Sequence, residues 1–458
     1  MFRRIFMQLI DDKYKNMTYK QTSFFFFLLV LIMSACGSSP DKAHRERTLT
    51  ALNGKDFRDT MNVSGNIPLL TQKNKSLYNI QYRRKSHDKN QIYTDQILKP
   101  EYRIIALESS DECMIGEIRN MLVDDSLVFV YDGWHENVFV FNLEGKFLNK
   151  VGQKGHARNE YTSITYISLD RELKQICLRD DDSQKLVFYD YQGHFLHCEP
   201  MFFWFDAFEI YGKNRIMLTL PYPNSDYPEI AKFKLTITDG KGQPVYGALL
   251  DPGFPKYSLM GSQFRTSMTR PMHTYPDGVY YMDILSPDTI WRIDSAECVP
   301  ILAADFGEPF TTSKTYQEMT NDKYLERINE VHALKDNFVF TRNFGYVTFD
   351  KSALIDLKTG KYIAGQVCRP IGPWKNLLTC ALDLAIYNGP YLFDWDSDQF
   401  AIVVYANDIL KATRGMRKNP DGEEAYQAWP QQDRVNLENL SAEDNPLIIV
   451  GTFNDFKE

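Results

Sequence analysis

The chain is long enough to bury a large core, and its composition excludes a disordered protein. It has 458 residues, of which 43% are hydrophobic and 14% aromatic, and this composition is typical of packed sheets. The net charge of −8 is uneven: residues 1–40 carry +3, residues 41–90 carry +6, and the remainder carries −17. Because an acidic body repels phosphate backbones, nucleic acid is not expected as a partner.

The first 35 residues have the pattern of an export signal. The apolar run FFFFLLVLIM at 24–33 is too short to cross a bilayer and is typical of a signal-peptide core. Ser34 and Ala35 then precede Cys36, an arrangement that resembles the bacterial lipobox, in which the Cys is acylated, for example with palmitate. We therefore expect Cys36 to carry a membrane anchor. Met17 is an alternative start, because Lys20 then supplies the positive charge ahead of the apolar run.

Residues 36–95 are predicted to form a lipid-anchored polar tether. They contain few apolar clusters and include the basic run RRK at 83–85, which leaves open an attraction to anionic headgroups. The folded domain is expected to span residues 96–458. Its first strand is predicted at 102–107, YRIIAL.

One structural unit occurs twice between residues 128 and 196. VFVYD at 128–132 corresponds to ICLRD at 176–180, VFVF at 138–141 to LVFY at 186–189, and GKFL at 145–148 to GHFL at 193–196. The offset is 48 residues each time. Short runs of β-branched and aromatic residues, separated by Asp, Asn and Gly turns at this period, are typical of β-propeller blades.

Further units follow along the chain and bring the expected number of blades to six. The third contains ITDGKGQPV at 237–245, and the fourth contains GVYYMD at 278–283 and DTIWRID at 288–294. The fifth contains YVTFD at 346–350, and the last contains YLFDWD at 391–396 and FAIVVYA at 400–406. The sequence therefore predicts an all-β fold, a six-bladed β-propeller.

Two inserts and the ring closure complete the predicted fold. Apolar residues at helical spacing predict short helices at 321–335 and at 423–440, the second interrupted by Pro430. An open ring would expose sheet edges that invite aggregation. We therefore expect the strand at 102–107 to pair with the C-terminal strand at 447–453.

Several of these stretches resemble a known group of proteins. The segments are GKFLNKVGQKGHARNEY at 145–161, YYMD and DTIWRI within 280–293, DFG at 305–307 and EDNPLIIV at 443–450. They resemble the six-bladed β-propeller lipoproteins of gut bacteria, which are related to NHL-repeat and TolB-like propellers. The resemblance covers roughly residues 100–455 and implies the fold and export, but no reaction.

The candidate binding face is the one that carries the loops into each blade and the turns between second and third strands. It includes the turns 132–136 and 180–184 and the loops 152–161, 221–229 and 251–273. Binding residues concentrate on loops held by a rigid scaffold. The candidate binding residues on this face are Trp134, His135, His156, Arg158, Glu160, Tyr161, Asp180 and Asp182.

Each candidate also has a structural interpretation. An exposed Trp134 could stack on a sugar, but it could also fold back onto a neighbouring blade. Asp180 and Asp182 offer oxygen ligands for Ca²⁺, but their contiguous run lacks the alternation and the Gly of a calcium loop and favours a solvated turn. His156, Arg158 and Glu160 offer an acid, a base and an anion clamp, in a loop that also suits a tight connection between blades.

No catalytic residues, metal site or cofactor are predicted, because the sequence has no metal-binding His/Cys constellation, nucleophile elbow or phosphate loop. The leading hypothesis is an outer-membrane-anchored, non-enzymatic propeller that binds a glycan, a peptide or an envelope protein at its loop-rich face. One alternative is a hydrolase or lyase acting on an envelope or dietary polysaccharide. A second is a structural component of an envelope complex. The side of the membrane stays open.

Overall fold

A computed structural model describes residues 67–81, 91–93, 97–219, 224, 228–250, 270–282, 289–305, 337–348, 352–368, 373–384 and 390–455. These residues belong to one compact unit, Arg58–Glu458. The predicted signal peptide, Cys36 and the predicted helix at 321–335 lie outside the described residues. No described helix has both the length and the apolar character needed to cross a membrane.

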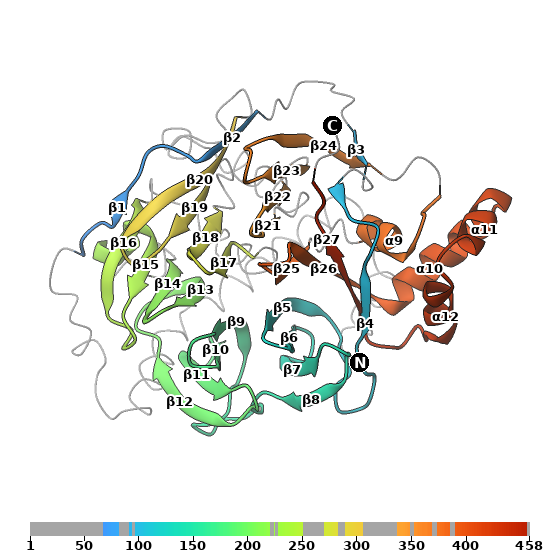
Figure 1. The fold of residues 1–458 in the computed structure, drawn as a ribbon. Coiled ribbons are helices and arrows are strands. Elements are labelled where there is room, and N and C mark those ends of the chain that lie inside the picture. The colour runs from blue at the N-terminus through green and yellow to red at the C-terminus, as the bar shows by residue number, and fades with distance from the viewer. Residues whose placement is uncertain are drawn as a thin grey trace, which may run out of the picture. The chain divides into compact units, whose positions relative to one another are not determined.

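The described strands form six sheets arranged around a centre, which confirms the six-bladed propeller (Figure 1). Blade one consists of β5 (Ile118–Asp124), β6 (Leu127–Asp132), β7 (Asn137–Asn142) and β8 (Phe147–Lys150). Blade two consists of β9 (Ile164–Asp170), β10 (Gln175–Asp180), β11 (Lys185–Asp190) and β12 (Phe195–Pro200). Blade three consists of β13 (Phe205–Tyr211), β14 (Asn214–Thr219), β15 (Phe233–Thr238) and β16 (Pro244–Leu250).

The remaining blades follow the same antiparallel order. Blade four consists of β17 (Met272–Tyr275), β18 (Gly278–Met282), β19 (Thr289–Ile293) and β20 (Glu297–Asp305). Blade five consists of β21 (Asn337–Phe340), β22 (Phe344–Thr348), β23 (Ser352–Asp356) and β24 (Tyr362–Cys368). Blade six combines β25 (Tyr391–Asp394), β26 (Gln399–Val404) and β27 (Leu447–Thr452) with β4 (Arg103–Ala106) from the start of the domain.

The ring closes as predicted, through antiparallel pairing of β4 with β27. Ile104 lies opposite Ile449 and Ile105 opposite Ile448. The strand at the start of the domain is therefore the outer strand of the last blade. Closure of this kind removes the open sheet edge that would otherwise remain between the two ends of the ring.

Alternate residues of each strand pack against opposite neighbouring blades, which explains the continuous apolar runs in the sequence. Val128 and Val130 of β6 contact the core shared with blade six, whereas Phe129 and Tyr131 contact the core shared with blade two. This follows from the two-residue period of a strand. Among the described residues, six apolar clusters fill the six spaces between adjacent blades. The apolar segment 202–208 is part of this core, since Phe203, Phe205 and Phe208 are buried.

The repeated Gly of the GKFL and GHFL segments ends a tight turn between third and fourth strands. In blade one, the Asn142 side chain accepts the backbone N–H groups of Glu144 and Lys146, and Gly145 adopts a φ of 83°. In blade two, Asp190 makes the equivalent turn and Gly193 has a φ of 85°. A side chain at either position would be strained, so the repeat requires Gly there.

Part of the segment 36–95, which was predicted to be a polar tether, is folded onto the propeller. Three short strands lie within residues 67–95 and pair in parallel with the outer strands of two blades: β1 (Thr71–Gln72) and β2 (Tyr78–Gln81) pair with β20, and β3 (Gln91–Tyr93) pairs with β24. Ile67, Leu70 and Ile80 are buried against the blades. This segment covers outer edges of the propeller because its backbone supplies the partners that those edges need.

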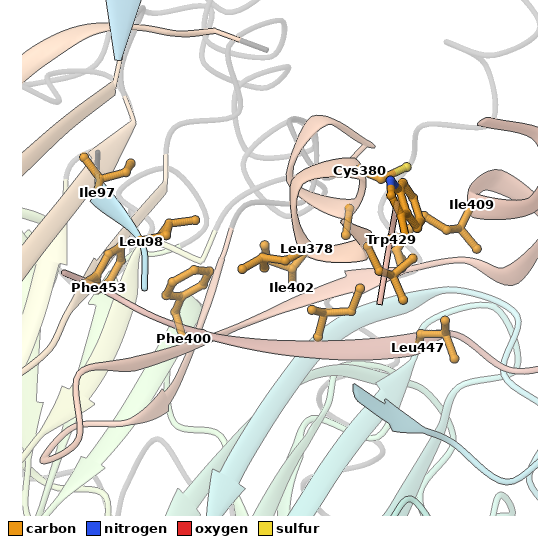
Figure 2. Packing of buried hydrophobic residues seen from close by; sticks show 14 of the residues in the cluster. Ile97, Leu98, Leu378, Cys380, Phe400, Ile402, Ile409, Trp429, Leu447 and Phe453 are labelled. Carbon is orange, nitrogen blue, oxygen red and sulfur yellow. The ribbon is translucent and has the colours of Figure 1, made fainter. Parts of the chain in front are cut away.

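Helices pack beside blade six (Figure 1). They are α9 (Leu377–Leu384), α10 (Ala406–Met416), α11 (Pro420–Gln427) and α12 (Gln431–Asn439), and a short α5 (Pro228–Ala231) lies in blade three. The predicted helix at 423–440 is confirmed as two helices, with Pro430 at the N-cap of the second. Figure 2 shows Trp429, Cys380 and Ile409 close together next to the strands of this blade. The indole of Trp429 is 2% exposed and donates to the carbonyl of Trp374 at 2.8 Å.

Candidate functional site

Three segments of the predicted binding face, the turns 132–136 and 180–184 and the loop 152–161, lie close together and are joined by side-chain contacts. The predicted loops 221–229 and 251–273 lie mostly outside the described residues, and Arg270 and His273 of the second line the cavity described below. Lys185 Nζ donates to the carbonyl of Glu160 at 2.6 Å, and Ser163 Oγ donates to Glu136 at 3.1 Å. Lys154 pairs with the carboxylate of Glu136. Their role in binding stays a prediction.

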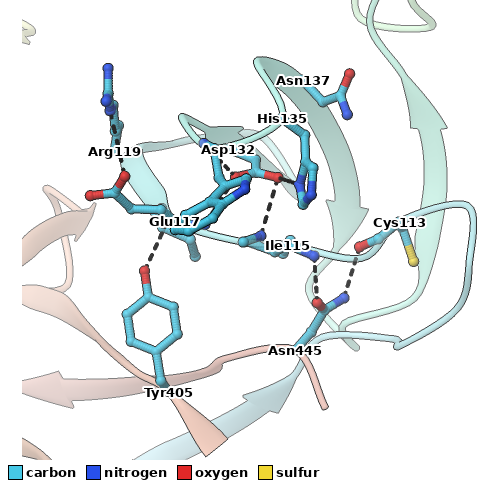
Figure 3. Close-up of polar contacts among 12 residues, drawn as sticks. Cys113, Ile115, Glu117, Arg119, Asp132, His135, Asn137, Tyr405 and Asn445 are labelled. Carbon is cyan, nitrogen blue, oxygen red and sulfur yellow. Dashed lines mark hydrogen bonds and ion pairs between the residues drawn. The ribbon is translucent and has the colours of Figure 1, made fainter. Parts of the chain in front are cut away.

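Asp132 holds the turn that presents Trp134 and His135. Its fully buried carboxylate accepts the backbone N–H of Glu117 at 2.9 Å and that of Trp134 at 3.0 Å, and His135 Nδ1 lies 2.6 Å from it. Figure 3 shows this network together with Asn445, which accepts the N–H of Ile115 at 2.8 Å. The histidine is therefore tied to the scaffold, whereas Trp134 is 75% exposed and does not fold back onto a blade.

Asp180 occupies the equivalent position in blade two and has a structural role. Its buried carboxylate accepts the N–H and the hydroxyl of Thr162, at 2.8 and 2.6 Å, and the N–H of Ser163 and Ser183, both at 3.2 Å. These donors occupy the oxygens that a cation would need. Asp182 is exposed beside it. The described part of the chain contains no cluster of three or more His, Cys, Asp or Glu side chains arranged to hold a metal ion.

The loop with His156, Arg158, Glu160 and Tyr161 is held by its own contacts. Glu160 accepts the N–H of Ala157 at 2.9 Å and the side-chain amide of Gln153, and these two hydrogen bonds lower the pKa of Glu160. Tyr161 is fully buried in the core between blades one and two. His156 and Arg158 are exposed. The arrangement is that of a tight connection between blades.

A cavity of about 650 Å³ lies at the opposite mouth of the central channel, where the inner strands β5, β9, β13, β17 and β25 end. Its wall combines charged and aromatic side chains from five blades. The polar and aromatic residues of this wall include Asp124, Arg171, Glu209, Tyr211, Arg270, His273, Thr274, Tyr275 and Trp395. None of the eight predicted binding residues lines it. A concave site with a few converging polar groups is a better candidate for a ligand site than a face whose loops hydrogen-bond to one another.

Among the carboxyl groups in the wall of this cavity, Glu209 has the most strongly shifted pKa. It is 4% exposed, and burial raises its pKa to about 7, although hydrogen bonds from Thr274, Ser168 and Tyr166 oppose the shift. The hydroxyl of Thr274 lies 2.8 Å from the carboxyl, that of Ser168 lies 3.0 Å away and that of Tyr166 lies 3.1 Å away. Perturbed carboxyls in a cavity are typical of functional sites.

Arg270 and His273 provide basic groups deeper in the channel. The guanidinium carbon of Arg270 lies 3.5 Å from the ring centroid of Tyr391, and burial lowers the pKa of Arg270. Burial, followed by the positive charge of Arg270, holds the pKa of His273 well below its usual value. The imidazole packs edge-on against Phe338, with ring centroids 4.8 Å apart.

Arg171 and Asp124 form the rim. Arg171 Nε lies 3.7 Å from the carboxylate of Asp124, which also accepts Lys174 Nζ at 2.9 Å and the hydroxyl of Tyr191 at 2.7 Å. Burial, followed by the hydrogen bond to Asp124, raises the pKa of Tyr191. The rim is thus a fixed polar network.

Sequence reasoning missed this site because it followed the loops. The available signal was Glu209, one of two acids in the apolar strand segment FDAFEIY at 205–211. A charge in the inner strand of a propeller is costly unless partners from other blades satisfy it. Those partners are far away in the sequence.

A family model described as a domain of unknown function, DUF4934, matches residues 77–452. The chain belongs to the DUF4934 family. No curated protein matches this DUF4934 chain. Its family therefore supports no particular reaction.

Two solved structures are similar to this DUF4934 chain. A protein of Bacteroides fragilis described as exported is 15% identical, with a TM-score of 0.57, over 82% of this chain and 99% of its own. A member of the DUF4221 family from Bacteroides vulgatus is 8% identical, with a TM-score of 0.43, over 78% of this chain and 97% of its own. The first likeness supports the fold, and the second is too loose to carry an argument.

Proposed function

We propose that this protein is a lipid-anchored propeller of the bacterial outer membrane that binds a glycan in its central cavity. The lipobox-like context of Cys36 supports the anchor, and the similar Bacteroides fragilis structure is described as exported. The observation that carries the binding proposal is the wall of the cavity. Tyr211, Tyr275 and Trp395 lie there beside ionisable groups.

A sugar offers both kinds of surface that such a wall recognises. Its ring faces pack on aromatic side chains, and its hydroxyls donate to carboxyls and accept from guanidinium groups. Trp395 is half-buried and fixed against Tyr275, with ring centroids 5.2 Å apart. An aromatic held in this way loses little freedom when a ligand binds.

The test uses the full chain in detergent micelles and isothermal titration calorimetry with cello-, xylo-, manno- and galacto-tetraose. We expect one of these neutral tetraoses to bind, and Trp395→Ala to weaken binding about tenfold, the loss expected for one stacked aromatic. Trp134→Ala, on the other face, should bind like the parent. Binding lost in Trp134→Ala but kept in Trp395→Ala would instead place the ligand on the loop-rich face.

The exposure of Trp134 favours this loop-rich face as a second candidate site, for a peptide or an envelope protein. An indole that is 75% exposed on a turn held by a buried carboxylate is a rigid contact, and Trp is a frequent anchor in protein interfaces. Photocrosslinking from position 134 in intact cells tests this candidate. An adduct with one envelope protein supports it, and labelling no greater than that from exposed Leu173 argues against it.

The enzyme alternative rests on Glu209, since a carboxyl with a pKa of about 7 suits general acid catalysis. Glycoside hydrolysis also requires a second carboxylate at a defined distance. Products of the bound tetraose, separated by chromatography after long incubation, distinguish a hydrolase or lyase from a binding protein.

A further inference from the structure

Within the described part of the chain, the hydrogen-bond partners of Glu209 are all hydroxyls, unlike those of the buried carboxylates Asp132 and Asp180. Tyr166 and Ser168 belong to β9, Thr274 belongs to β17, and Glu209 itself belongs to β13, so three neighbouring blades meet at one carboxyl group. Among the described residues, no Lys, Arg or His lies within ion-pair distance of it. By contrast, Glu199 has two hydrogen bonds from the Arg215 guanidinium, and its pKa is lowered despite burial.

A cage of hydroxyls can hold a carboxyl group in either protonation state. Each hydroxyl donates to the ionised carboxylate, and each can rotate to accept from the protonated acid. An ion pair cannot do this, because it stabilises the charged form alone. The geometry at Glu209 therefore permits proton exchange without loss of the surrounding hydrogen bonds.

The charged and titratable groups around Glu209 come from every element packed against it. They are Tyr166 of β9, Arg171 of the following turn, Arg270 just before β17, His273 and Tyr275 of β17, and Asp206 on the same strand. Arg171 favours the ionised carboxylate through its charge. Burial outweighs this attraction in the structure.

We propose that Glu209 recognises a hydroxyl of a neutral glycan in the cavity, and that it takes up a proton as the glycan displaces water. The inference rests on the proposed function, since it names the residue through which that ligand is held. A bound sugar replaces mobile water at the cavity wall, and this further desolvation penalises the charged carboxylate. A protonated carboxyl can then donate to a ligand hydroxyl while it still accepts from the cage.

The experiment measures the number of protons exchanged when the tetraose that binds is titrated into the full chain. Calorimetry is repeated at pH 7 in phosphate and in Tris, whose ionisation enthalpies differ, so the difference in heat gives the protons taken up. With a pKa of about 7, Glu209 is about half protonated at pH 7, and we expect uptake of about half a proton per site. Uptake should fall toward zero at pH 5, where Glu209 is already protonated.

Two variants distinguish loss of proton uptake from general damage to the folded protein. Glu209→Gln keeps the shape of the side chain and a donor, so it should still bind the tetraose but with the same heat in both buffers. Glu144→Gln changes an exposed residue that does not line the cavity and should behave like the parent. Proton uptake that persists in Glu209→Gln, or binding by the parent without uptake, overturns the proposal and leaves the proposed function standing.

Failure of the proposed function gives a different result. If none of the tetraoses binds the parent, then glycan binding and the recognition role of Glu209 fall together. Infrared difference spectra then decide whether the cage itself exchanges a proton. A carboxylic acid band that titrates near pH 7 and is missing from Glu209→Gln shows that it does, and its absence from the parent shows that it does not.

Discussion

At the scale of single residues, Glu209 should set part of the pH dependence of stability. Its pKa of about 7 in the folded protein lies above its ordinary value of 4.5. Between these two values the folded state holds a proton that the unfolded state has released, so the free energy of unfolding falls as the pH rises. Above pH 7 the loss is complete, at up to about 3 kcal/mol for a shift of this size.

The Glu209→Gln variant checks this sign. Urea unfolding of parent and variant should give similar stabilities at pH 4.5, and the variant should be the more stable of the two at pH 8. Glu144→Gln is the matched control and should follow the parent at both values. A variant that loses stability equally at pH 4.5 and pH 8 would show that the carboxyl acts mainly through its hydrogen bonds to the neighbouring strands, and not through its protonation.

Asp132 should make a large contribution to stability through its hydrogen bonds. Asp132→Ala removes the shared acceptor of the backbone N–H groups of Glu117 and Trp134 and empties a fully buried position, at a cost that we put at about 3 kcal/mol. His135→Ala removes a ring that is 48% exposed together with its one contact to Asp132, and it should cost less than about 1 kcal/mol because the backbone donors still satisfy the carboxylate. Denaturant unfolding of the two variants measures the difference, and equal losses would refute this account of the turn.

The turn-holding carboxylates Asp132 and Asp180 are more predictable from the sequence than the cavity carboxyl Glu209. Asp132 and Asp180 end corresponding strands of the repeat, so their shared role follows once the 48-residue offset is seen. Glu209 receives hydrogen bonds from Ser168 and Thr274, on the blades to either side. No local pattern brings these residues together, because only the closed ring does so.

At the scale of elements, strands and turns were predictable and the helices only partly so. The repeat predicts the strands of blades one and two because both faces of each strand are buried. Pro430 marks the break between α11 and α12 because it lacks the N–H that a continuous helix requires. The apolar segment of α9, LLTCALDL, has a length and character that also suit a buried strand, so periodicity could not identify it as a helix.

The stability of helices α10, α11 and α12 should depend on the packing of Trp429. Trp429→Ala removes a large side chain that is 2% exposed and breaks its hydrogen bond to Trp374, for which we expect a loss of about 3 to 5 kcal/mol. Val435→Ala on α12, where the side chain is 38% exposed, is the control and should cost little. Hydrogen exchange should rise within residues 406–440 of the Trp429 variant, and unchanged protection there would contradict this dependence.

The closing strand should be indispensable. Deletion of residues 447–458 removes β27, the partner of both β26 and β4, and we expect no cooperative melting transition in circular dichroism. Ile449→Ala, at a fully buried position of the same strand, should still fold but lose about 2 to 5 kcal/mol. A truncated chain that melts like the parent would refute closure through this strand.

At the scale of the whole molecule, the ring was predictable but the segment around its edge was not. Strand number and order follow from repeated units, and closure follows from the cost of an open edge. The strands β1, β2 and β3 have only two to four residues each, TQ, YNIQ and QIY, with no apolar alternation. Their pairing is decided by the edges that they cover, which a linear sequence does not display.

This edge segment constrains the order in which the molecule can be assembled. Thr71 is opposite Glu297 and Gln91 is opposite Gln366, so each of these early strands must wait for a partner that the ribosome makes much later. The same holds for Ile104, whose partner Ile449 is nearly the last residue of the domain to be made. Pairings that close such long loops form slowly. The early strands of the nascent chain therefore remain unpaired until the last blade has been synthesised. A chaperone that binds roughly the first hundred residues would protect these strands from aggregation during that interval.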